Sequence, residues 1–535
     1  MNLASRLDHI AQTQPNKPAF IFYTPRSKNW DTITFAQLAD STQHFVIGLQ
    51  TLRSDSAEAC PLIPGIRAAL LTPPSADFFA LAFAMLKLGI VPIIVDPAIG
   101  LKKVSQCLKE SQPNIFLGNF FTHALRILFG WGKGSIKHNL SIPRLLRNIP
   151  SLIPNSEFLI PNSSPAAIIY TSGSTGIPKG VLYTHANFAS QLDMLQQTFD
   201  ITQDEIDLPA FPLYALIDAL LGVTSIIPDI TFPIPKNINP AQTLSAIQEY
   251  QVTNTFASPI VLDKLANYGV QHNIKLPSLK RVITAGAPAP IQVQEKFRKL
   301  LMDDTDLFGV YGATESLPIA VIESREIIGD AKNRTANGAG VCLGRSVNGA
   351  NVRVIGISES AIPHWEDSLE VRPNIVGEIT VQGAAVTRSY IQREDANRLS
   401  KIQNGDEVIH RMGDVGYFDE QGRLWYCGRK SHRVIIKDDV LFTEQIEGIF
   451  NAHPLVYRTA LVGVKGEPVL WVELEKRARV KKDKIRNELS ELAAQHPQAS
   501  KIKAFLFMKT FPTDVRHNSK IIRERLTLLA EKRLA

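Results

Sequence analysis

The chain contains 535 residues, of which 44% are hydrophobic and 20% charged, and its formal net charge is +7. That length is too great for one ordinary core and that balance excludes a disordered chain, so we predict a compact protein of at least two structural units. A mild basic excess is most often a solvated surface, and no DNA- or RNA-binding signature accompanies it, so nucleic acid is not an expected partner.

The N-terminal segment and the cysteines bear on the cell compartment. The segment MNLASRLDHIAQTQPNKPAF lacks the basic start and unbroken apolar run of a signal peptide. The cysteines form no CxxC pair and no Cys/His cluster, which argues against disulfides and structural zinc and suits reduced thiols. We therefore predict a cytoplasmic protein with ordinary thiols at Cys60, Cys107, Cys342 and Cys427.

The most apolar stretch of the chain covers residues 78–95. Lys87, Gly89 and Pro92 interrupt it and divide it into a helix-like half, FFALAFAMLKL, and a strand-like half, IVPIIV. This pattern favours a buried helix followed by a buried strand over a transmembrane span. We expect the protein to be soluble, or at most peripheral to a membrane.

Short apolar runs such as RAALLT, IIVDP, AAIIYTS and LKRVITAG are each followed by a turn or a helical pattern. This alternation predicts mainly parallel sheets covered by helices, with the chemistry on loops at the strand ends. Residues 351–428 contain short strands separated by Gly, Asn and Asp turns, which predicts an antiparallel β unit. The basic, mixed segment after Gly428 predicts a small α+β domain.

Residues 120–148 combine aromatic and aliphatic side chains with basic ones and contain no acid. The simpler interpretation is a surface helix and loop packed on the domain. The alternative is a basic, apolar patch that meets a membrane surface or admits a lipid-like substrate. The basic residues of the segment are Arg126, Lys133, Lys137, Arg144 and Arg147.

The most distinctive segment is YTSGSTGIPKG, residues 170–180, directly after the strand-like AAII. Its small residues leave the backbone free to wrap a polyphosphate, and its N–H groups, hydroxyls and lysine ammonium favour anionic oxygens. It is not a Walker A loop, because the GK[ST] ending is missing. The candidate phosphate-binding residues are Thr171, Ser172, Gly173, Ser174, Thr175, Gly176 and Lys179.

This loop and four later segments resemble, over essentially the whole chain, the adenylate-forming superfamily of acyl-CoA synthetases, firefly luciferase and nonribosomal peptide synthetase adenylation domains. The later segments are GAP at residues 286–288, YGATE at 311–315, MGDVGY at 412–417 with GR at 428–429, and NSK at 518–520. The resemblance implies ATP and Mg²⁺ as cofactors.

The same resemblance implies a role for each matching residue. In YGATE, which begins with Tyr311 and Gly312, Thr314 would meet the phosphate and Glu315 would hold magnesium. The remaining matches are a loop beside the adenine, two residues at the ribose and a mobile lysine: Gly286, Ala287 and Pro288; Asp414 and Arg429; and Lys520.

Elementary chemistry agrees with these implied roles. Carboxylate attack on the α-phosphorus of ATP builds negative charge on the phosphate oxygens, so a metal ion and a lysine ammonium are useful there. A glutamate offers a hard oxygen, which suits Mg²⁺ better than zinc. By resemblance, the C-terminal domain turns about a hinge near residues 430–431 and carries Lys520 into the site for adenylation.

Several longer segments are similar, more narrowly, to the β-lactone synthetases of bacterial olefin biosynthesis. They include PAFPLYALIDALLGVTSIIPDI, HRMGDVGYFDEQGRLWYCGRKSHRV and FPTDVRHNSKIIRERL. This resemblance implies a 2-alkyl-3-hydroxy fatty acid whose carboxylate is adenylated and whose 3-hydroxyl then displaces AMP. It also implies partner enzymes in the pathway: a thiolase-like condensing enzyme, a reductase and a decarboxylase.

Other residues leave alternatives open. Asp438 stands where CoA ligases usually carry a glycine near the pantetheine thiol, which weakens CoA thioester formation, although it also suits a surface turn. His432 and Arg433 either contact the closing hydroxyl or the departing AMP, or belong to a surface loop. His185 packs or caps a helix, and His517 lies close to Lys520. Residues 212–227, nearly free of charge, are expected to form part of the core, and the resemblance implies that they also border an acyl pocket.

The sequence therefore predicts an α/β fold with a large N-terminal domain, residues 1–429, for ATP and the acyl substrate, including a β subdomain at 351–428. Residues 430–535 are expected to form a mobile α+β lid. The predicted function is ATP- and Mg²⁺-dependent β-lactone synthesis from a long-chain 2-alkyl-3-hydroxy fatty acid. The alternative is a long-chain fatty acyl-CoA ligase or fatty acyl-AMP ligase. A binding relative without activity is disfavoured by the intact phosphate loop, Glu315 and Lys520.

Overall fold

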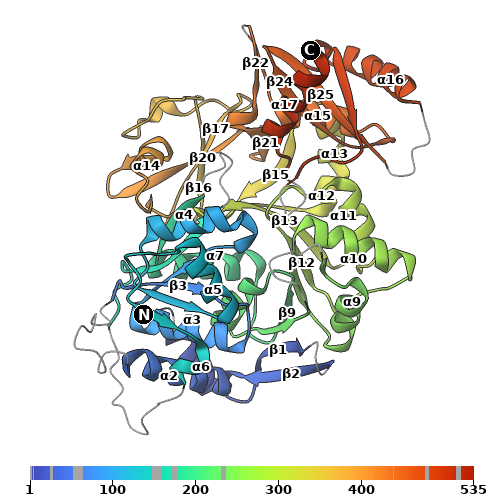
Figure 1. Ribbon diagram of the computed structural model, residues 1–535. Helices are drawn as coiled ribbons and strands as arrows, with labels where there is room; N and C mark the ends of the chain where they lie inside the picture. Colours follow the sequence, from blue (N-terminus) through green and yellow to red (C-terminus); the bar gives the residue numbers. More distant parts are fainter. Residues whose placement is uncertain are drawn as a thin grey trace.

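The computed structural model describes residue 3 and residues 5–24, 28–51, 64–146, 159–171, 178–229, 237–437, 439–475, 481–513 and 520–535. Two large sheets and a smaller C-terminal sheet organise these residues, with helices between and around them (Figure 1). The fold is mixed α/β with a C-terminal α+β part, as the strand–helix alternation predicted.

The seven-stranded sheet has the order β18-β8-β7-β4-β3-β5-β6. Strands β7, β4, β3, β5 and β6 run parallel, whereas β8 turns back antiparallel to β7 and pairs with the two-residue strand β18. The strands are β3 (Arg67–Leu71), β4 (Val91–Ile94), β5 (Ile115–Gly118), β6 (His138–Leu140), β7 (Pro165–Thr171), β8 (Lys179–Thr184) and β18 (Ser389–Tyr390).

Helix α3 (Ala76–Leu88) and strand β4 account for the most apolar stretch of the chain, as predicted. The Ser75 side chain accepts a hydrogen bond from the Phe78 N–H at the start of the helix. Gly89 ends the helix with φ of 66°, a conformation that glycine adopts without strain. No helix in the described part of the chain is long and apolar enough to cross a membrane.

The second sheet has 14 strands and two halves that meet at β14 and β15. Its parallel half has the order β13-β12-β11-β9-β10-β1, with β2 antiparallel at the edge. These strands are β1 (Pro18–Thr24), β2 (Asn29–Thr34), β9 (Ile206–Pro209), β10 (Thr224–Ile227), β11 (Asn254–Ala257), β12 (Arg281–Thr284) and β13 (Asp306–Ala313).

The antiparallel half of this sheet contains the β unit that the turn-rich sequence predicted. Strand β15 lies before residue 351 and pairs with both β14 and β21, so the β unit continues the parallel strands in one sheet. The strands are β14 (Ser316–Glu323), β15 (Val341–Ser346), β16 (Asn351–Ile355), β17 (Gly377–Gln382), β19 (Lys401–Asn404), β20 (Glu407–Phe418) and β21 (Leu424–Arg429).

The C-terminal part, red in Figure 1, has its own three-stranded sheet and its own core. Its elements are the β22 (Val434–Ile436) and β23 (Asp439–Leu441) hairpin, α15 (Thr443–Asn451), β24 (Val456–Val464), β25 (Glu467–Leu474), α16 (Lys482–Ala494), β26 (Ala504–Met508) and α17 (Arg523–Leu534). The domain boundary at residues 429–430 and the mobility of this part stay predictions.

The other helices cover the two large sheets. They are α1 (Ser5–Thr13), α2 (Phe35–Thr51), α4 (Leu101–Ser111), α5 (Phe120–Phe129), α6 (Ile142–Leu145), α7 (His185–Phe199), α8 (Ala215–Leu221), α9 (Pro240–Glu249), α10 (Pro259–Gln271), α11 (Ile291–Arg298), α12 (Ser324–Glu326), α13 (Lys332–Ala336) and α14 (Glu394–Ser400).

Candidate active site

A cleft of about 3320 Å³ lies where the two large sheets and the C-terminal part meet. Every described residue of the candidate ATP-binding motifs lines it, although these residues are up to about 350 positions apart in the sequence. They are Thr171, Lys179, Gly286, Ala287, Pro288, Tyr311, Gly312, Thr314, Glu315, Asp414, Arg429 and Lys520. Ser172, Gly173, Ser174, Thr175 and Gly176 lie outside the described residues.

The phosphate-loop motif connects the antiparallel strands β7 and β8. Thr171 ends β7 and pairs across the hairpin with Lys179, which begins β8. Burial lowers the pKa of Lys179, and the nearby Glu315 carboxylate opposes this effect. The hairpin therefore presents a lysine ammonium beside the loop that the sequence predicts to bind phosphate.

Thr314 and Glu315 form the turn between β13 and β14. The Tyr183 hydroxyl donates a hydrogen bond to the Thr314 carbonyl, and the Thr387 N–H donates to the Glu315 carbonyl at 2.9 Å. The Glu315 side chain accepts a hydrogen bond from the Tyr390 hydroxyl at 2.6 Å. The backbone of Glu315 is thus held by Thr387, and its carboxylate by Tyr390 of β18.

Tyr390 was not identified in the sequence, yet it connects the main charged groups of the site. Its ring lies 5.0 Å from the Lys179 ammonium and 5.5 Å from that of Lys401, both measured to the ring centroid. Lys401 is buried and donates a hydrogen bond to the Thr387 carbonyl. Burial lowers the pKa of Lys401 to about 7, against the opposing effect of Glu315. No sequence motif connects Tyr390 with Glu315. The two residues come together only in the fold, where the two-residue strand β18 places Tyr390 next to Glu315.

We expect Tyr390→Phe to weaken magnesium use, because the variant keeps the ring near both lysines but loses the hydroxyl that orients Glu315. The magnesium concentration for half-maximal ATP–pyrophosphate exchange should rise roughly tenfold or more. Tyr417→Phe is the matched control, since the Tyr417 hydroxyl donates to the Ala339 carbonyl outside this cleft. Equal magnesium requirements in the wild type and Tyr390→Phe would contradict this role.

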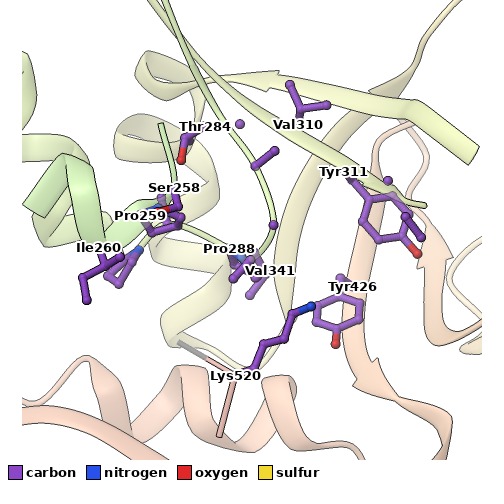
Figure 2. A pocket seen from close by; sticks show the side chains of 18 of the residues that line it. Ser258, Pro259, Ile260, Thr284, Pro288, Val310, Tyr311, Val341, Tyr426 and Lys520 are labelled. Carbon is purple, nitrogen blue, oxygen red and sulfur yellow. The ribbon is translucent and has the colours of Figure 1, made fainter. Parts of the chain in front are cut away.

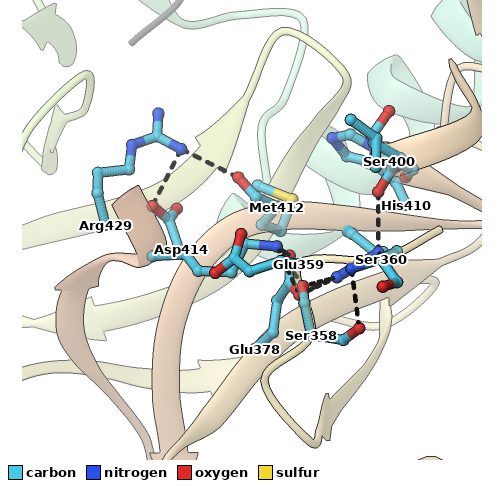
Figure 3. A network of polar contacts seen from close by, with 12 residues as sticks. Ser358, Glu359, Ser360, Glu378, Ser400, His410, Met412, Asp414 and Arg429 are labelled. Atoms are coloured by element: carbon cyan, nitrogen blue, oxygen red, sulfur yellow. Dashed lines mark hydrogen bonds and ion pairs between the residues drawn. The ribbon is translucent and has the colours of Figure 1, made fainter. Parts of the chain in front are cut away.

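Asp414 and Arg429 pair across strands β20 and β21, with Arg429 Nη1 3.1 Å from Asp414 Oδ1. The Tyr311 hydroxyl donates to Asp414 Oδ2 at 2.7 Å, and Arg429 also donates to the Met412 carbonyl (Figure 3). Burial raises the pKa of Asp414, while Arg429 lowers it. The Arg429 contact to Asp414 Oδ1 is an ion pair rather than a well-directed hydrogen bond, so this buried oxygen keeps the capacity to accept a hydrogen bond from a ligand hydroxyl.

The loop after β12 and the C-terminal lysine face each other across the cleft. Gly286 has φ of 92°, which a residue with a side chain rarely adopts, and Ala287 and Pro288 follow it along the wall. In Figure 2 the Lys520 side chain extends from the C-terminal part into the cleft, which Tyr426, Pro288 and Val341 also line. Its charge also lowers the pKa of Asp414.

The apolar segment at residues 212–227 divides between core and cleft. Ala215, Ala219 and Leu221 are buried in the core, whereas other residues of the segment line the cleft. Those lining residues, with apolar neighbours from α3 and α7, are Leu213, Leu216, Ile217, Leu220, Phe83, Leu86, Phe188 and Leu192. These apolar side chains are suited to an acyl chain rather than to a polar substrate.

Asp218 is the one charged residue in that segment, and it faces away from the cleft. It accepts a hydrogen bond from the Ser225 hydroxyl at 2.7 Å, and burial raises its pKa to about 7. Burial and the neighbouring Asp218 also raise the pKa of Asp207 well above its usual value. The pair is buried, with Asp207 on β9 and Asp218 on α8.

The histidines near the motifs occupy different surroundings. His432 lines the cleft 3.7 Å from a Glu524 oxygen, and burial lowers its pKa to about 4, so it is neutral at pH 7. Arg433 pairs with Glu359 at 2.5 Å. His185 is buried at the start of α7, where burial lowers its pKa to about 4. His517 and Asp438 lie outside the described residues.

A buried polar network supports the region next to residue 429. Arg411 contacts Glu378 Oε2 at 2.6 Å and the Ser358 carbonyl at 2.6 Å (Figure 3). Lys430 donates to the same Ser358 carbonyl at 2.8 Å and lies 3.2 Å from Glu378. Lys430 is therefore fixed to the antiparallel half of the large sheet, and a hinge at residues 430–431 would begin after this anchor.

The described cysteines are suited to packing rather than chemistry. Cys107, Cys342 and Cys427 are all buried, and burial raises the pKa of the Cys342 thiol to about 11. Cys60 lies outside the described residues.

The site has a suitable carboxylate for Mg²⁺. Within the described ranges, no cluster of three or more His, Cys, Asp or Glu residues could hold a metal alone. Mg²⁺ is commonly held by one or two carboxylates together with substrate phosphates. Glu315, oriented by Tyr390 and close to Lys179, fits that arrangement.

Comparisons with known proteins agree with this geometry. The family model for AMP-binding enzymes matches residues 7–391. The olefin beta-lactone synthetase of Xanthomonas campestris pv. campestris is 38% identical over 99% of this chain and 97% of its own length. That of Stenotrophomonas maltophilia is 37% identical over 100% of this chain and 98% of its own length. The fold is similar to O-succinylbenzoate Coenzyme A synthetase from Bacillus subtilis, solved with ATP and a magnesium ion; the TM-score is 0.76 at 21% identity, covering 97% of this chain and 98% of that chain.

Proposed function

The chain belongs to the AMP-binding enzyme family, and from this premise we propose that it makes a β-lactone from a long-chain 2-alkyl-3-hydroxy fatty acid. The carboxylate attacks the α-phosphorus of ATP and releases pyrophosphate. The 3-hydroxyl oxygen of the same molecule then attacks the acyl carbon. The bond to AMP breaks, and the hydroxyl proton leaves.

The observation that carries this proposal is the similarity to two olefin beta-lactone synthetases along nearly the entire chain. The cleft adds chemical support, because the charged residues of the family motifs and a group of apolar side chains line the same cavity. The proposed substrate combines a carboxylate that reacts with ATP and long alkyl chains.

The side chains of the cleft can divide the work of adenylation. Lys179 and Lys520 bring positive charge to phosphate oxygens that become more negative during attack. Asp414 Oδ1 would accept a hydrogen bond from a ribose hydroxyl. Arg429 and Tyr311 hold the Asp414 carboxylate in place. The lactone step needs no second substrate, because the attacking hydroxyl is tethered to the acyl group.

Mg²⁺ completes the proposed site. Glu315 would hold it together with the ATP phosphates, and Tyr390 would keep the carboxylate turned toward it. When bound, Mg²⁺ supplies charge that stabilises the phosphate oxygens and orients the polyphosphate.

Both synthetase relatives favour lactone formation over CoA ligation. The expectation that Asp438 weakens CoA thioester formation stays a prediction, because Asp438 lies outside the described residues. The proposal also keeps the cytoplasm as the location and the thiolase-like, reductase and decarboxylase enzymes as pathway partners.

A substrate in which the 3-hydroxyl is replaced by a methoxy group tests the division into two steps. We expect adenylation to proceed, giving about one pyrophosphate per active site, and then to stop with acyl-AMP bound. The 3-hydroxy parent should turn over continuously under the same conditions. Continuous AMP release from the methoxy compound, at the rate of the parent, would contradict attack by the 3-hydroxyl.

A further inference from the structure

Helix α5 presents an unusual face to solvent. Its exposed residues are Phe120, Phe121, Ala124, Ile127 and Leu128, so the spacing i, i+1, i+4, i+7 and i+8 places all of them on one side of the helix. Phe120 is 90% exposed, Ile127 73% and Leu128 75%. A surface helix normally turns its polar side outward, so this contiguous apolar face indicates a binding surface.

The opposite side of α5 is firmly attached to the protein. Leu125 and Phe129 pack against the core that contains Trp131, and the His123 ring lies 5.0 Å from the Phe116 ring of β5. His123 Nε2 is also 3.0 Å from the Leu140 carbonyl. The side of α5 that faces the core is therefore already packed, and the apolar face on the other side is a surface of the folded protein.

The segment that carries this face contains basic residues and no acidic ones. The sequence contains no Asp or Glu between Glu110 and Glu157. Within that interval, Lys133, Lys137 and Arg144 are exposed on the segment that follows the helix. Arg126 is different: its guanidinium lies 5.7 Å from the centroid of the Phe116 ring, on the inner side. Aromatic and aliphatic side chains in a segment whose charged residues are all basic are complementary to an anionic lipid surface.

We propose that α5 docks this protein on an anionic membrane. The side chains that enter the boundary between the lipid head groups and the acyl chains are Phe120, Phe121, Ile127 and Leu128. Lys133, Lys137 and Arg144 contact the lipid head groups. A protein partner is less well matched, because the exposed stripe of α5 carries no polar side chain. Helix α5 lines no part of the active-site cleft and lies far from the C-terminal part (Figure 1), so docking leaves the cleft accessible.

Sedimentation with lipid vesicles tests this surface without depending on the reaction that the enzyme catalyses. The apolar-face variant carries Phe120→Ser, Phe121→Ser, Ile127→Ser and Leu128→Ser; a second variant carries Lys133→Glu, Lys137→Glu and Arg144→Glu. The control places four serines at exposed apolar positions elsewhere: Met302→Ser, Ile375→Ser, Leu528→Ser and Leu534→Ser. Thermal melts of all the proteins establish that each is folded.

We expect the wild type and the control to bind vesicles of phosphatidylglycerol and phosphatidylcholine, and to bind pure phosphatidylcholine weakly. Partitioning should fall at least about tenfold in the apolar-face variant, and high salt or the glutamate variant should weaken it. Failure of the wild type to bind anionic vesicles, or equal binding by the apolar-face variant, would overturn the proposal. So would a lipid-free oligomer, detected by light scattering, that the apolar-face variant abolishes.

Discussion

Lys520→Ala should reduce the rate of acyl-adenylate formation by about 100- to 1000-fold while leaving ATP affinity within about threefold of the wild type. Lys520 lines the cleft, and its charge lowers the pKa of Asp414. The other groups proposed to bind the nucleotide lie on other elements of the structure. A charge that matters mainly as the α-phosphate becomes more negative stabilises the transition state more than the bound substrate. ATP–pyrophosphate exchange gives the rate, and equilibrium titration with ATP gives the affinity.

Lys532→Ala is the matched control for this experiment. It removes the same charge from the same C-terminal part, in α17, at an exposed position that does not line the cleft. The control should exchange pyrophosphate at the wild-type rate. A fully active Lys520→Ala variant would remove Lys520 from the proposed chemistry, and a large loss of ATP affinity would make it a binding residue instead.

The fold was predictable where the sequence pattern follows local physics. The apolar run at residues 78–95 is interrupted near its middle, which divides it into a helix-like half and a strand-like half. Helix α3 and strand β4 occur where this pattern predicted them. Strand β15 was not anticipated as part of the β unit, because its role depends on pairing with β14 and β21. Pairing between distant strands is a tertiary property that a local pattern does not contain.

The site shows the same division. The motif residues could be identified from the unusual local composition of their segments, and those that the structure describes line a single cleft. Tyr390 and Lys401 gave no such signal, because a tyrosine or lysine between strands is ordinary in a sequence. Their contacts with Glu315 and Lys179 arise from strand β18 and from burial, which only the fold creates.

Helix α5 illustrates how a structure separates two interpretations of one segment. The sequence of residues 120–148 allowed either a packed surface helix or a basic, apolar patch. The structure contains elements of both, since Leu125 and Phe129 pack inward while four large apolar side chains face solvent. It also contains the short strand β6, which extends the seven-stranded sheet beside the helix.

We propose that the second step is intramolecular, and a comparison of the products formed with and without CoA tests this directly. The purified protein receives ATP, Mg²⁺ and a racemic 2-alkyl-3-hydroxy fatty acid, and proton NMR and mass spectrometry identify the products. We expect a β-lactone at the same rate in both reactions, with one AMP formed per lactone, because the attacking hydroxyl belongs to the acyl group. A CoA thioester, with AMP formation that requires CoA, would contradict the account and make the protein a fatty acyl-CoA ligase.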